Sequence, residues 1–344
     1  MRKVISLSGL LICLCLCGCD AGNTQGYDYA EREIFAMDTA MTIKAYGKDA
    51  ELAVDEAVDE IKRLDTLLSV GIDASEVSRI NFSGEGTLSE DTQYLVERSL
   101  EIFKSTDGAY DITVYPLMKL WGFIDITPAL PDESRIREVL SFAGSDKLSL
   151  KGNRLVLGEA QGIDLGGIAK GYTGSRIMDI FKKHELISGM VSLGGNVQLY
   201  GAKPDGSLWR CGITDPEHPY DGSFIGVVSL RDKAVITSGG YERNFTDTSG
   251  KTYHHIMDMK TGYPAESGLL SVTIVSSDGT LADALSTACF VMGADKAAEY
   301  WRNSGYEFDM IILTADGKLS VTDGLSDSFE SDREYDIINS LPPA

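Results

Sequence analysis

The stretch "LLSVTIVSSDGTLADALSTACF" (residues 269–290) contains the two patterns that decide the fold class. Its first part, 269–277, is rich in β-branched residues and is typical of a strand. In 278–290 the apolar residues recur at helical spacing, and Thr280 stands where it can cap the first turn. A strand that leads directly into a helix indicates a fold in which sheets are covered by packed helices.

The predicted helix carries a carboxylate and a hydroxyl on one face, because Asp283 and Thr287 stand four residues apart. One explanation is structural: an acid near a helix N-terminus is favoured by the helix dipole, and a threonine can bond back to a carbonyl. The other is chemical, since oxygen ligands suit Mg²⁺, which shares its coordination with waters and substrate phosphates. The helix alone does not decide between the two explanations.

The rest of the chain alternates predicted helices with hairpin-like strands. Helices are predicted at 49–69, 90–105, 134–143, 168–184 and 294–303. Strands are predicted at 41–47, 147–150, 154–157, 189–201, 208–214, 225–230 and 234–240, with a hairpin around Gly317. Neither a repeat nor a linker rich in proline or glycine interrupts 33–330. We therefore predict a single domain of the α+β (mixed α/β) class at 33–330, followed by a tail at 331–344.

The N-terminal stretch "MRKVISLSGLLICLCLCGC" (1–19) is typical of a secretion signal. Arg2 and Lys3 precede an apolar run that is too short to span a membrane comfortably. Gly18 followed by Cys19 resembles a bacterial lipobox, which implies removal of 1–18 and lipid on the Cys19 sulfur; a plain secretory signal is the alternative. We expect 19–32 to tether the protein to the extracytoplasmic face of the cell membrane, the periplasmic side of the inner membrane in a cell with two membranes.

The chain is strongly acidic, with 52 Asp and Glu residues against 31 Lys and Arg residues and a formal charge of -21. Such a surface repels nucleic acid, and no basic cluster in the sequence offsets it, so we expect no nucleic-acid partner. An anionic ligand would have to be held by a metal ion or by oriented backbone amides.

Cysteine and histidine offer few candidates for chemistry. Outside the predicted signal only Cys211 and Cys289 remain, and we expect both to be buried as small apolar residues. His255, in "KTYHHIMDMKTGYP" (251–264), is a candidate general base, with a packed structural role as the alternative. The sequence lacks further ligands at the spacing of a zinc site.

Glycine clusters mark three predicted strand ends: "IDLGGIAKGY" (163–172), "SLGGN" (192–196) and "ITSGGYERNF" (236–245). Such turns let backbone N–H groups approach a phosphate, although each cluster is also explained as a plain tight turn. None of them matches a Walker A loop or a dinucleotide-binding fingerprint. Together with the oxygen-lined helix face, they point to phosphoanhydride chemistry assisted by Mg²⁺.

Seven motifs in this order resemble those of the bacterial FAD:protein FMN transferases, the ApbE family. Three are the glycine clusters, and the others are "DGAYDITVYPLMKLWGF" (107–123), "WRCGITDP" (209–216), "HHIMDMKTGYP" (254–264) and "SVTIVSSDGTLADALSTACFVMG" (271–293). The resemblance covers about 35–320 and implies an ApbE-like, T-fold-related architecture. It also implies transfer of the FMN half of FAD onto a Thr or Ser hydroxyl of a target protein, with release of AMP.

The resemblance leaves two other activities open at the same site. One is hydrolysis of FAD to FMN and AMP, and the other is binding of flavin without turnover by a lipid-anchored protein. The implied partners are FAD and an acceptor protein, either a membrane respiratory subunit or a secreted flavoprotein. The implied metal is Mg²⁺, with Mn²⁺ as the alternative.

The resemblance further implies the roles of individual residues. Asp283, Thr287 and the carbonyl of Gly167 would hold the metal ion, and His255 would deprotonate the acceptor hydroxyl. Flavin and adenine contacts are implied at Met37, Ala109, Tyr110, Asp111, Asp164, Lys170 and Met257. Two positions depart from the family pattern: Asp38 replaces the glycine of its Met-Gly-Thr motif, and Gly71 stands where some members carry an aromatic residue against the flavin ring.

Overall fold

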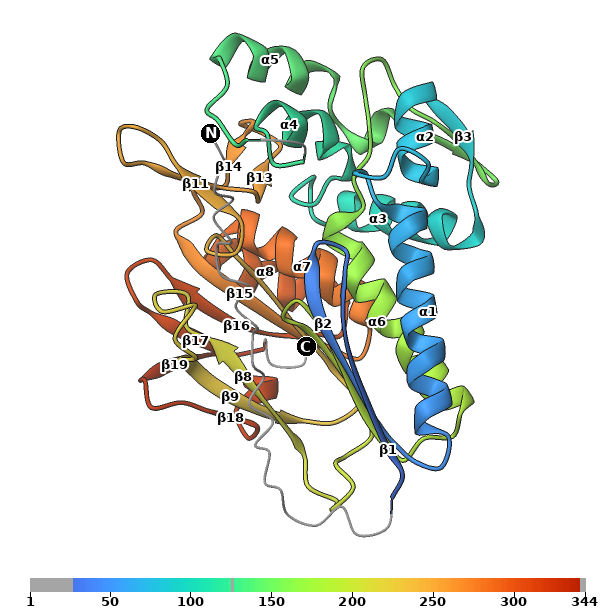
Figure 1. Ribbon diagram of the computed structural model, residues 1–344. Coiled ribbons are helices and arrows are strands. Elements are labelled where there is room, and N and C mark those ends of the chain that lie inside the picture. Colours follow the sequence, from blue (N-terminus) through green and yellow to red (C-terminus); the bar gives the residue numbers. More distant parts are fainter. Residues whose placement is uncertain (1–26, 125–126, 341–344) are drawn as a thin grey trace, which may run out of the picture.

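The computed structural model describes residues 27–124 and 127–340, so the predicted signal peptide, Cys19 and most of the predicted tether lie outside the described residues. A nine-stranded sheet runs through the molecule (Figure 1). Its neighbouring strands are antiparallel except for the last pair, which is parallel. In spatial order they are β1 (Tyr29–Ala36), β2 (Thr39–Tyr46), β6 (Ser188–Leu193), β7 (Asn196–Tyr200), β10 (Ala234–Gly239), β15 (Leu269–Ser276), β16 (Asp309–Thr314), β17 (Leu319–Thr322) and β19 (Tyr335–Ile338).

The sheet separates two hydrophobic cores, because successive residues of a strand point to opposite faces. In β16, Met310 and Ile312 belong to the core under the helices, whereas Ile311 and Leu313 belong to the core under a second sheet. The second sheet consists of β18 (Phe329–Glu330), β9 (Phe224–Leu230) and β8 (Trp209–Thr214). The fold is therefore built from a helical layer, the large sheet and the small sheet.

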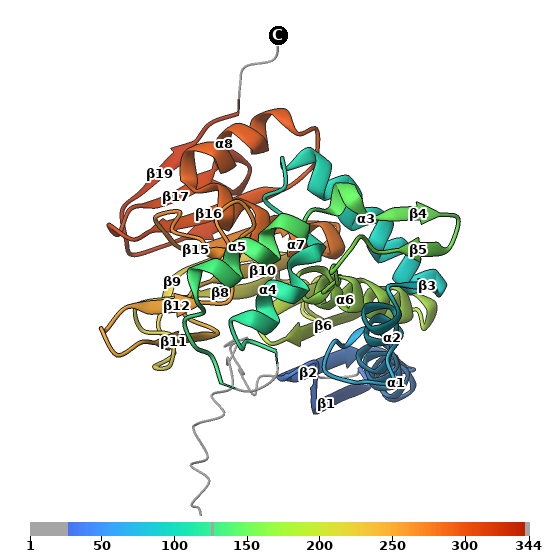
Figure 2. The same cartoon turned by 90° about the horizontal axis from the view of Figure 1, so that it is seen from above.

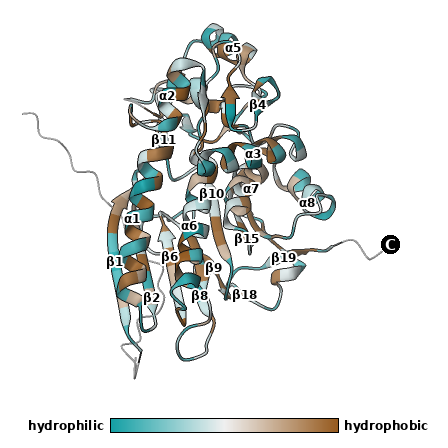
Figure 3. Ribbon diagram, turned by 90° about the vertical axis from the view of Figure 1, so that its right-hand side faces the viewer, coloured by the Kyte–Doolittle hydropathy of each residue, from teal (hydrophilic) through white to brown (hydrophobic). Residues whose placement is uncertain are grey.

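The helical layer contains α1 (Ala50–Leu68), α6 (Gly166–Lys183), α7 (Gly279–Met292) and α8 (Ala294–Asn303). The outer helix α1 buries Val54, Ala57 and Ile61 and leaves its charged residues in solvent, so it carries both hydrophobic and hydrophilic residues in Figure 3. The inner helix α7 is buried along most of its length. A carboxylate on such a helix has to be stabilised by the protein or by a ligand.

Further elements complete the domain around the ends of the large sheet. The strands β3 (Glu85–Thr87), β5 (Arg154–Val156) and β4 (Ser149–Lys151) form a small sheet beside α3 (Glu90–Ser105) (Figure 2). The other helices are α2 (Glu76–Ser83), α4 (Tyr115–Leu120) and α5 (Glu133–Phe142), with short 3₁₀ turns at Ile112–Val114, Ser145–Lys147 and Asp323–Leu325. Two hairpins, β11 (Asn244–Thr246) with β12 (Thr252–His254) and β13 (Met257–Asp258) with β14 (Tyr263–Pro264), follow β10.

The structure confirms the predicted α+β class and the burial of Cys211 and Cys289. The predicted cap of α7 was wrong, because Asp278 and not Thr280 accepts the N–H of Leu281, at 3.0 Å. The folded domain also extends past 33–330 at both ends, since β1 starts at Tyr29 and β19 pairs with β17. Within 27–124 and 127–340, no helix has the length and apolarity needed to cross a bilayer.

Candidate active site

A cleft of about 710 Å³ opens where the helical layer meets the ends of the central strands. Its walls come from segments far apart in the chain: the β1–β2 turn, the loop before α4, the start of α6, the β6–β7 turn, β8, the loop after β10, and α7. All eleven site residues implied within the described residues line it, namely Met37, Ala109, Tyr110, Asp111, Asp164, Gly167, Lys170, His255, Met257, Asp283 and Thr287. Gly71 lies outside the cleft lining.

Asp283 is buried at the floor of the cleft, with 5% of its surface exposed. Its Oδ2 accepts a hydrogen bond of 2.8 Å from the backbone N–H of Gly171 on the neighbouring helix α6. Burial raises the pKa of the Asp283 carboxyl, and the ammonium of Lys170 opposes this shift. The carboxylate therefore holds its charge only with support from nearby donors or from a cation.

The bond to Asp283 has a consequence for Gly167. In a regular helix the N–H of residue 171 bonds to the carbonyl of residue 167. The Gly171 N–H also donates to the Asp283 carboxylate, and a backbone carbonyl has two lone pairs, so the Gly167 carbonyl keeps acceptor capacity for a ligand. A Cβ placed on Gly167 would stand 3.7 Å from Thr287 Oγ1, so these two implied metal ligands are neighbours.

Thr287 does not bond back to its own helix, which was one explanation of its position. The contact of its Oγ1 is Ser238 Oγ on β10, at 3.5 Å, while Ser238 Oγ lies closer to Ser286 Oγ, at 2.7 Å. The hydroxyl of Thr287 is therefore weakly engaged. Asp283, Thr287 and Gly167 together present oxygen atoms to one part of the cleft, a donor set that suits Mg²⁺.

Two further polar groups at the cleft lack full hydrogen-bond partners among the described residues. The hydroxyl of Tyr110 is buried close to Gly167 and beside the Ser99 hydroxyl, without a well-formed hydrogen bond. The side-chain amide of Asn196 lies by the Asp283 carboxylate, where its N–H group lowers the pKa of that carboxyl, and its oxygen has no hydrogen-bond partner among the described residues. Buried polar atoms are nearly always paired, so these atoms are ready to bind a ligand.

His255 is held by the backbone carbonyl of Arg243, which accepts from the His255 N–H at 3.0 Å and lies 3.2 Å from its Nδ1. Since a carbonyl only accepts, Nδ1 carries the proton and Nε2 keeps a free lone pair. Desolvation and the charge of Arg243 lower the pKa of His255 to about 3, so the imidazole is neutral at physiological pH. The Arg243 guanidinium is itself fixed by a 2.6 Å bond to the Phe123 carbonyl.

His254, the other histidine of the pair, has a structural role. Its Nε2 lies 3.2 Å from the Ala265 carbonyl, and its Nδ1 accepts from the Ile256 N–H at 3.2 Å. Both ring nitrogens therefore form hydrogen bonds with backbone groups. Its ring also packs edge-on against Phe290 of α7.

The carboxylate of Asp111 is largely used by the protein itself, whereas that of Asp164 accepts one backbone hydrogen bond. Asp111 accepts from the N–H and hydroxyl of Thr113 and from the N–H and hydroxyl of Ser145. Asp164 accepts from the Gly166 N–H at 2.8 Å, at the start of α6. Both shape the cleft, and Asp111 has little capacity left for a side-chain contact with a ligand.

Glu242 and Arg243 line the cleft and were not singled out from the sequence. The Glu242 side chain is exposed at the cleft, where partial desolvation and the charge of Asp283 raise the pKa of its carboxyl. The charge of Lys170 opposes this shift. Both residues belong to the motif "ITSGGYERNF", but nothing in the sequence places their side chains near Asp283 and His255.

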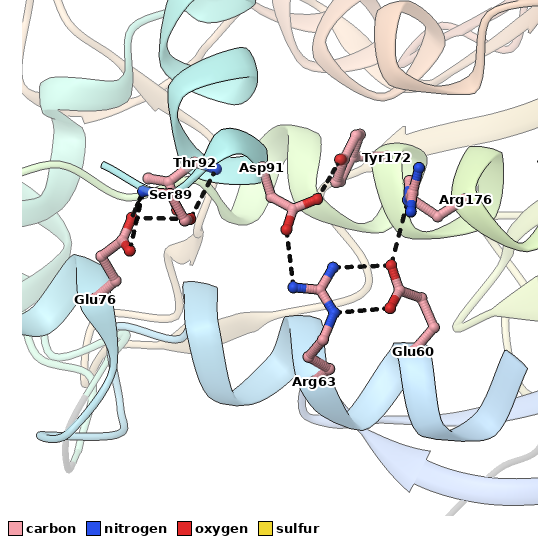
Figure 4. Close-up of polar contacts among 8 residues, drawn as sticks. All are labelled: Glu60, Arg63, Glu76, Ser89, Asp91, Thr92, Tyr172 and Arg176. Atoms are coloured by element: carbon pink, nitrogen blue, oxygen red, sulfur yellow. Dashed lines mark hydrogen bonds and ion pairs between the residues drawn. The ribbon is translucent and has the colours of Figure 1, made fainter. Parts of the chain in front are cut away.

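A second depression, of about 760 Å³, lies outside the cleft and is surrounded by paired charges. Arg63 of α1 bonds to Glu60 at 2.7 Å and to Asp91 of α3 at 2.8 Å (Figure 4). Tyr172 of α6 donates to Asp91 at 2.5 Å, and Arg176 bonds to Glu60 at 3.2 Å. These groups bind one another and fix α6 directly behind Gly171, so they support the cleft and do not form a second site.

Residues 37–312 match the ApbE family. This protein belongs to the ApbE family. It is 32% identical to the FAD:protein FMN transferase of Treponema pallidum over 93% of this chain and 94% of that protein. It is 31% identical to a Klebsiella pneumoniae protein of the same name, over 81% and 87% of the two chains. Because these relatives are FAD:protein FMN transferases and are matched over most of their length, the protein is a flavin transferase.

Solved ApbE structures share the architecture. The ApbE protein of Thermotoga maritima superimposes with a TM-score of 0.82 at 33% identity, over 89% of this chain and 100% of that one. The Pseudomonas stutzeri flavinyl transferase ApbE gives a TM-score of 0.79 at 27% identity, over 90% and 100% of the two chains. The ApbE fold expected from the seven motifs is thereby confirmed.

The β1–β2 turn of this ApbE protein carries a departure from the family motif that can be tested. Met37 and Asp38 adopt φ values of 47° and 59°, a region that favours glycine. We expect Asp38→Gly to raise the free energy of unfolding by about 0.5–1 kcal/mol and to lower the KM for anionic FAD, since Asp38 lines the cleft. Denaturant unfolding and steady-state kinetics measure the two effects.

Asp38→Asn distinguishes the effect of the charge from that of the backbone conformation, because asparagine removes the charge and still tolerates a positive φ. This variant should lower the KM and leave the free energy of unfolding nearly unchanged. Asp232→Gly is the matched control at φ 52°, outside the cleft. Its Oδ1 accepts from the Gly201 N–H, so this change should not stabilise the protein. If Asp38→Gly, Asp38→Asn and Asp232→Gly all have the KM of the parent protein, Asp38 does not face the substrate.

Proposed function

We propose that the protein transfers the FMN moiety of FAD onto a Thr or Ser hydroxyl of an acceptor protein in a Mg²⁺-dependent reaction, forming a phosphoester bond and releasing AMP. The observation that carries this proposal is the bond from Gly171 N–H to Asp283. It brings the carboxylate, the Gly167 carbonyl and the Thr287 hydroxyl to one wall of a cleft in which His255 keeps a free Nε2.

The donor set fits one Mg²⁺ ion shared with substrate. Within the described residues no group of three or more His, Cys, Asp or Glu side chains is arranged to hold a metal, and the proposed set has a single carboxylate. A lone carboxylate with two neutral oxygens leaves room for phosphate oxygens and water, as Mg²⁺ requires. When bound, the ion would supply the positive charge that holds the pyrophosphate and stabilises the leaving AMP.

The residues of the chain divide the remaining work. Nε2 of His255 takes the proton of the acceptor hydroxyl, and the hydroxyl oxygen forms a bond to the FMN phosphorus. The bond from that phosphorus to the bridging oxygen breaks, and AMP leaves with that oxygen and its electron pair. Lys170 adds positive charge beside Asp283, and the buried hydroxyl of Tyr110 can donate to the substrate.

The proposal is tested by incubating the protein with FAD, Mg²⁺ and a candidate acceptor protein. Transfer predicts a fluorescent flavin band on the acceptor in a denaturing gel, an equal amount of AMP, and loss of both with EDTA. AMP with free FMN and no labelled band would favour the pyrophosphatase. Intact FAD would favour a flavin-binding protein without turnover.

His255→Gln should lower the rate of transfer by about 10²–10⁴-fold, the usual contribution of a positioned base. FAD binding should be retained, because the glutamine amide can still donate to the Arg243 carbonyl. Since the pKa of His255 is about 3, the imidazole is neutral throughout the range from about pH 5.5 to pH 8. The ratio of the transfer rate of the parent protein to that of His255→Gln should therefore stay constant over this range. Single-turnover rates measure this ratio, and a ratio that collapses toward 1 would exclude His255 as the base.

We also propose that Cys19 carries lipid and holds the protein at the extracytoplasmic face of the cell membrane, where it would meet a membrane respiratory subunit or a secreted flavoprotein. The support is the signal-like stretch 1–19, whose charged start, apolar run and terminal cysteine match a lipoprotein signal. Cys19→Ser should release the protein from the membrane fraction of expressing cells. Unchanged partitioning of this variant would contradict the anchor.

A further inference from the structure

Exposed apolar side chains gather at one end of the large sheet. Among the described residues, eleven large hydrophobic side chains are exposed, and five of them lie in segments that meet at the start of β1. We call these five the basal surface. They are Tyr27 (44% exposed), Tyr29 (41%), Leu52 (62%), Ile187 (47%) and Leu208 (42%).

Strand pairing and backbone bonds bring the five together. Tyr29 pairs with Tyr46, and Tyr46 pairs with Ser188, next to Ile187. The ring of Tyr46 lies 6.4 Å from that of Trp209, which follows Leu208. The turn into α1, which carries Leu52, is tied to the start of β1 by the bond from Gly47 N–H to the Asp28 carbonyl, at 2.9 Å. This is the lower end of the molecule in Figure 1.

The local charge differs from that of the whole chain. The segments that form the basal surface are 27–29, 47–52, 182–187 and 201–208. They contain four lysines and five Asp or Glu residues, a net charge of -1, whereas the whole chain carries -21. The basal surface is thus a nearly neutral, partly apolar area on a strongly acidic protein, and a phospholipid surface does not repel it.

We infer that the basal surface rests on the phospholipid bilayer to which the protein is anchored. The inference depends on the proposed lipid at Cys19, which is eight residues before Tyr27. Eight residues span at most roughly 29 Å, so the start of β1 cannot move far from the membrane. Tyrosine is favoured at the boundary between lipid and water, because its ring is apolar and its hydroxyl is polar.

The lipid anchor also explains why five exposed side chains are enough to hold the basal surface against the bilayer. Two tyrosines and three aliphatic side chains bind lipid weakly when the protein is free in solution. A short tether converts this contact into an intramolecular one, for which effective concentrations reach the millimolar range. The basal surface then fixes how the domain is oriented, while the lipid supplies the membrane affinity.

The test uses the lipidated full chain in phosphatidylcholine vesicles that contain a nitroxide-labelled lipid. A fluorophore is attached through Ile187→Cys on the basal surface or, as the matched control, through Phe82→Cys on α2, where the side chain is 95% exposed. Cys211 and Cys289 are buried and are protected from labelling. We expect the label at 187 to lose at least about half of its emission and the label at 82 to keep nearly all of it.

Equal emission from the two labels on vesicle-bound protein would overturn the inference and leave the anchor intact. Protein that does not float with the vesicles would overturn both the anchor and the inference. Leu52→Ser combined with Leu208→Ser should restore the emission of the label at 187, whereas Phe82→Ser should not change it. The double change should leave FMN transfer to a soluble acceptor unaltered, because both side chains lie outside the cleft.

Discussion

Replacing Asp283 with alanine is expected to abolish nearly all FMN transfer. Asp283 is the one carboxylate of the proposed Mg²⁺ site, and the positive charge that it holds is worth several kcal/mol in the transition state. A loss of about 10³-fold or more in kcat/KM follows from that value. The fold should survive, because the change removes a carboxylate whose burial is unfavourable.

The measurement combines transfer kinetics with Mg²⁺ titration and thermal unfolding. Asp283→Asn is the informative companion, since its oxygen can still accept from the Gly171 N–H but it lacks the charge. It should unfold like the parent and transfer almost as poorly as the alanine variant. Thr287→Ser keeps a hydroxyl at the site and should remain active. Near-normal turnover by Asp283→Ala would remove the carboxylate from the proposed mechanism.

Replacing Gly171 with alanine should cost about 3 kcal/mol of unfolding free energy, the upper part of the usual range for overpacking. A Cβ on Gly171 would stand 2.2 Å from the carbonyl oxygen of Gly279 and 2.6 Å from the Cβ of Asp283. Both neighbours belong to α7, and a carbonyl oxygen cannot move aside as a flexible side chain can. The two helices must therefore separate.

Separation of α6 and α7 also breaks the bond from Gly171 N–H to Asp283. The variant should consequently lose most of its transfer activity even under conditions where it is folded. Denaturant unfolding measures the stability, and Gly71→Ala is the control, because a Cβ there meets only Ser69 Oγ at 3.6 Å. A Gly171→Ala protein as stable as the parent would show that the helices are not in tight contact.

Local patterns in the sequence predicted a large part of this structure. Helical spacing placed Asp283 and Thr287 on one face of α7, and the structure keeps them there. Glycine clusters predicted close approaches, and Gly171 and Gly167 are found at such positions. These predictions succeed because helical periodicity and the lack of a Cβ act within a few residues.

The features that were missed depend on contacts between distant segments. Asp278 and Thr280 are both acceptable caps, and the choice is made by the pairing of β15 with β10, which continues to Ser276. Glu242 and Arg243 reach the cleft only through the path of the loop after β10, which the sequence does not specify. Similarly, Asp111 reaches Ser145 across a loop, which no spacing rule describes.

The β1–β2 hairpin joins the basal surface to the cleft and has a fixed length. Its first strand starts at Tyr29 on the basal surface, and Met37, directly after its last residue, lines the cleft. Eight extended residues measure about 26 Å. A domain lying on its basal surface therefore holds its reactive centre at about this distance from the lipid surface. An acceptor hydroxyl held at a very different distance from the lipid cannot reach the reactive centre.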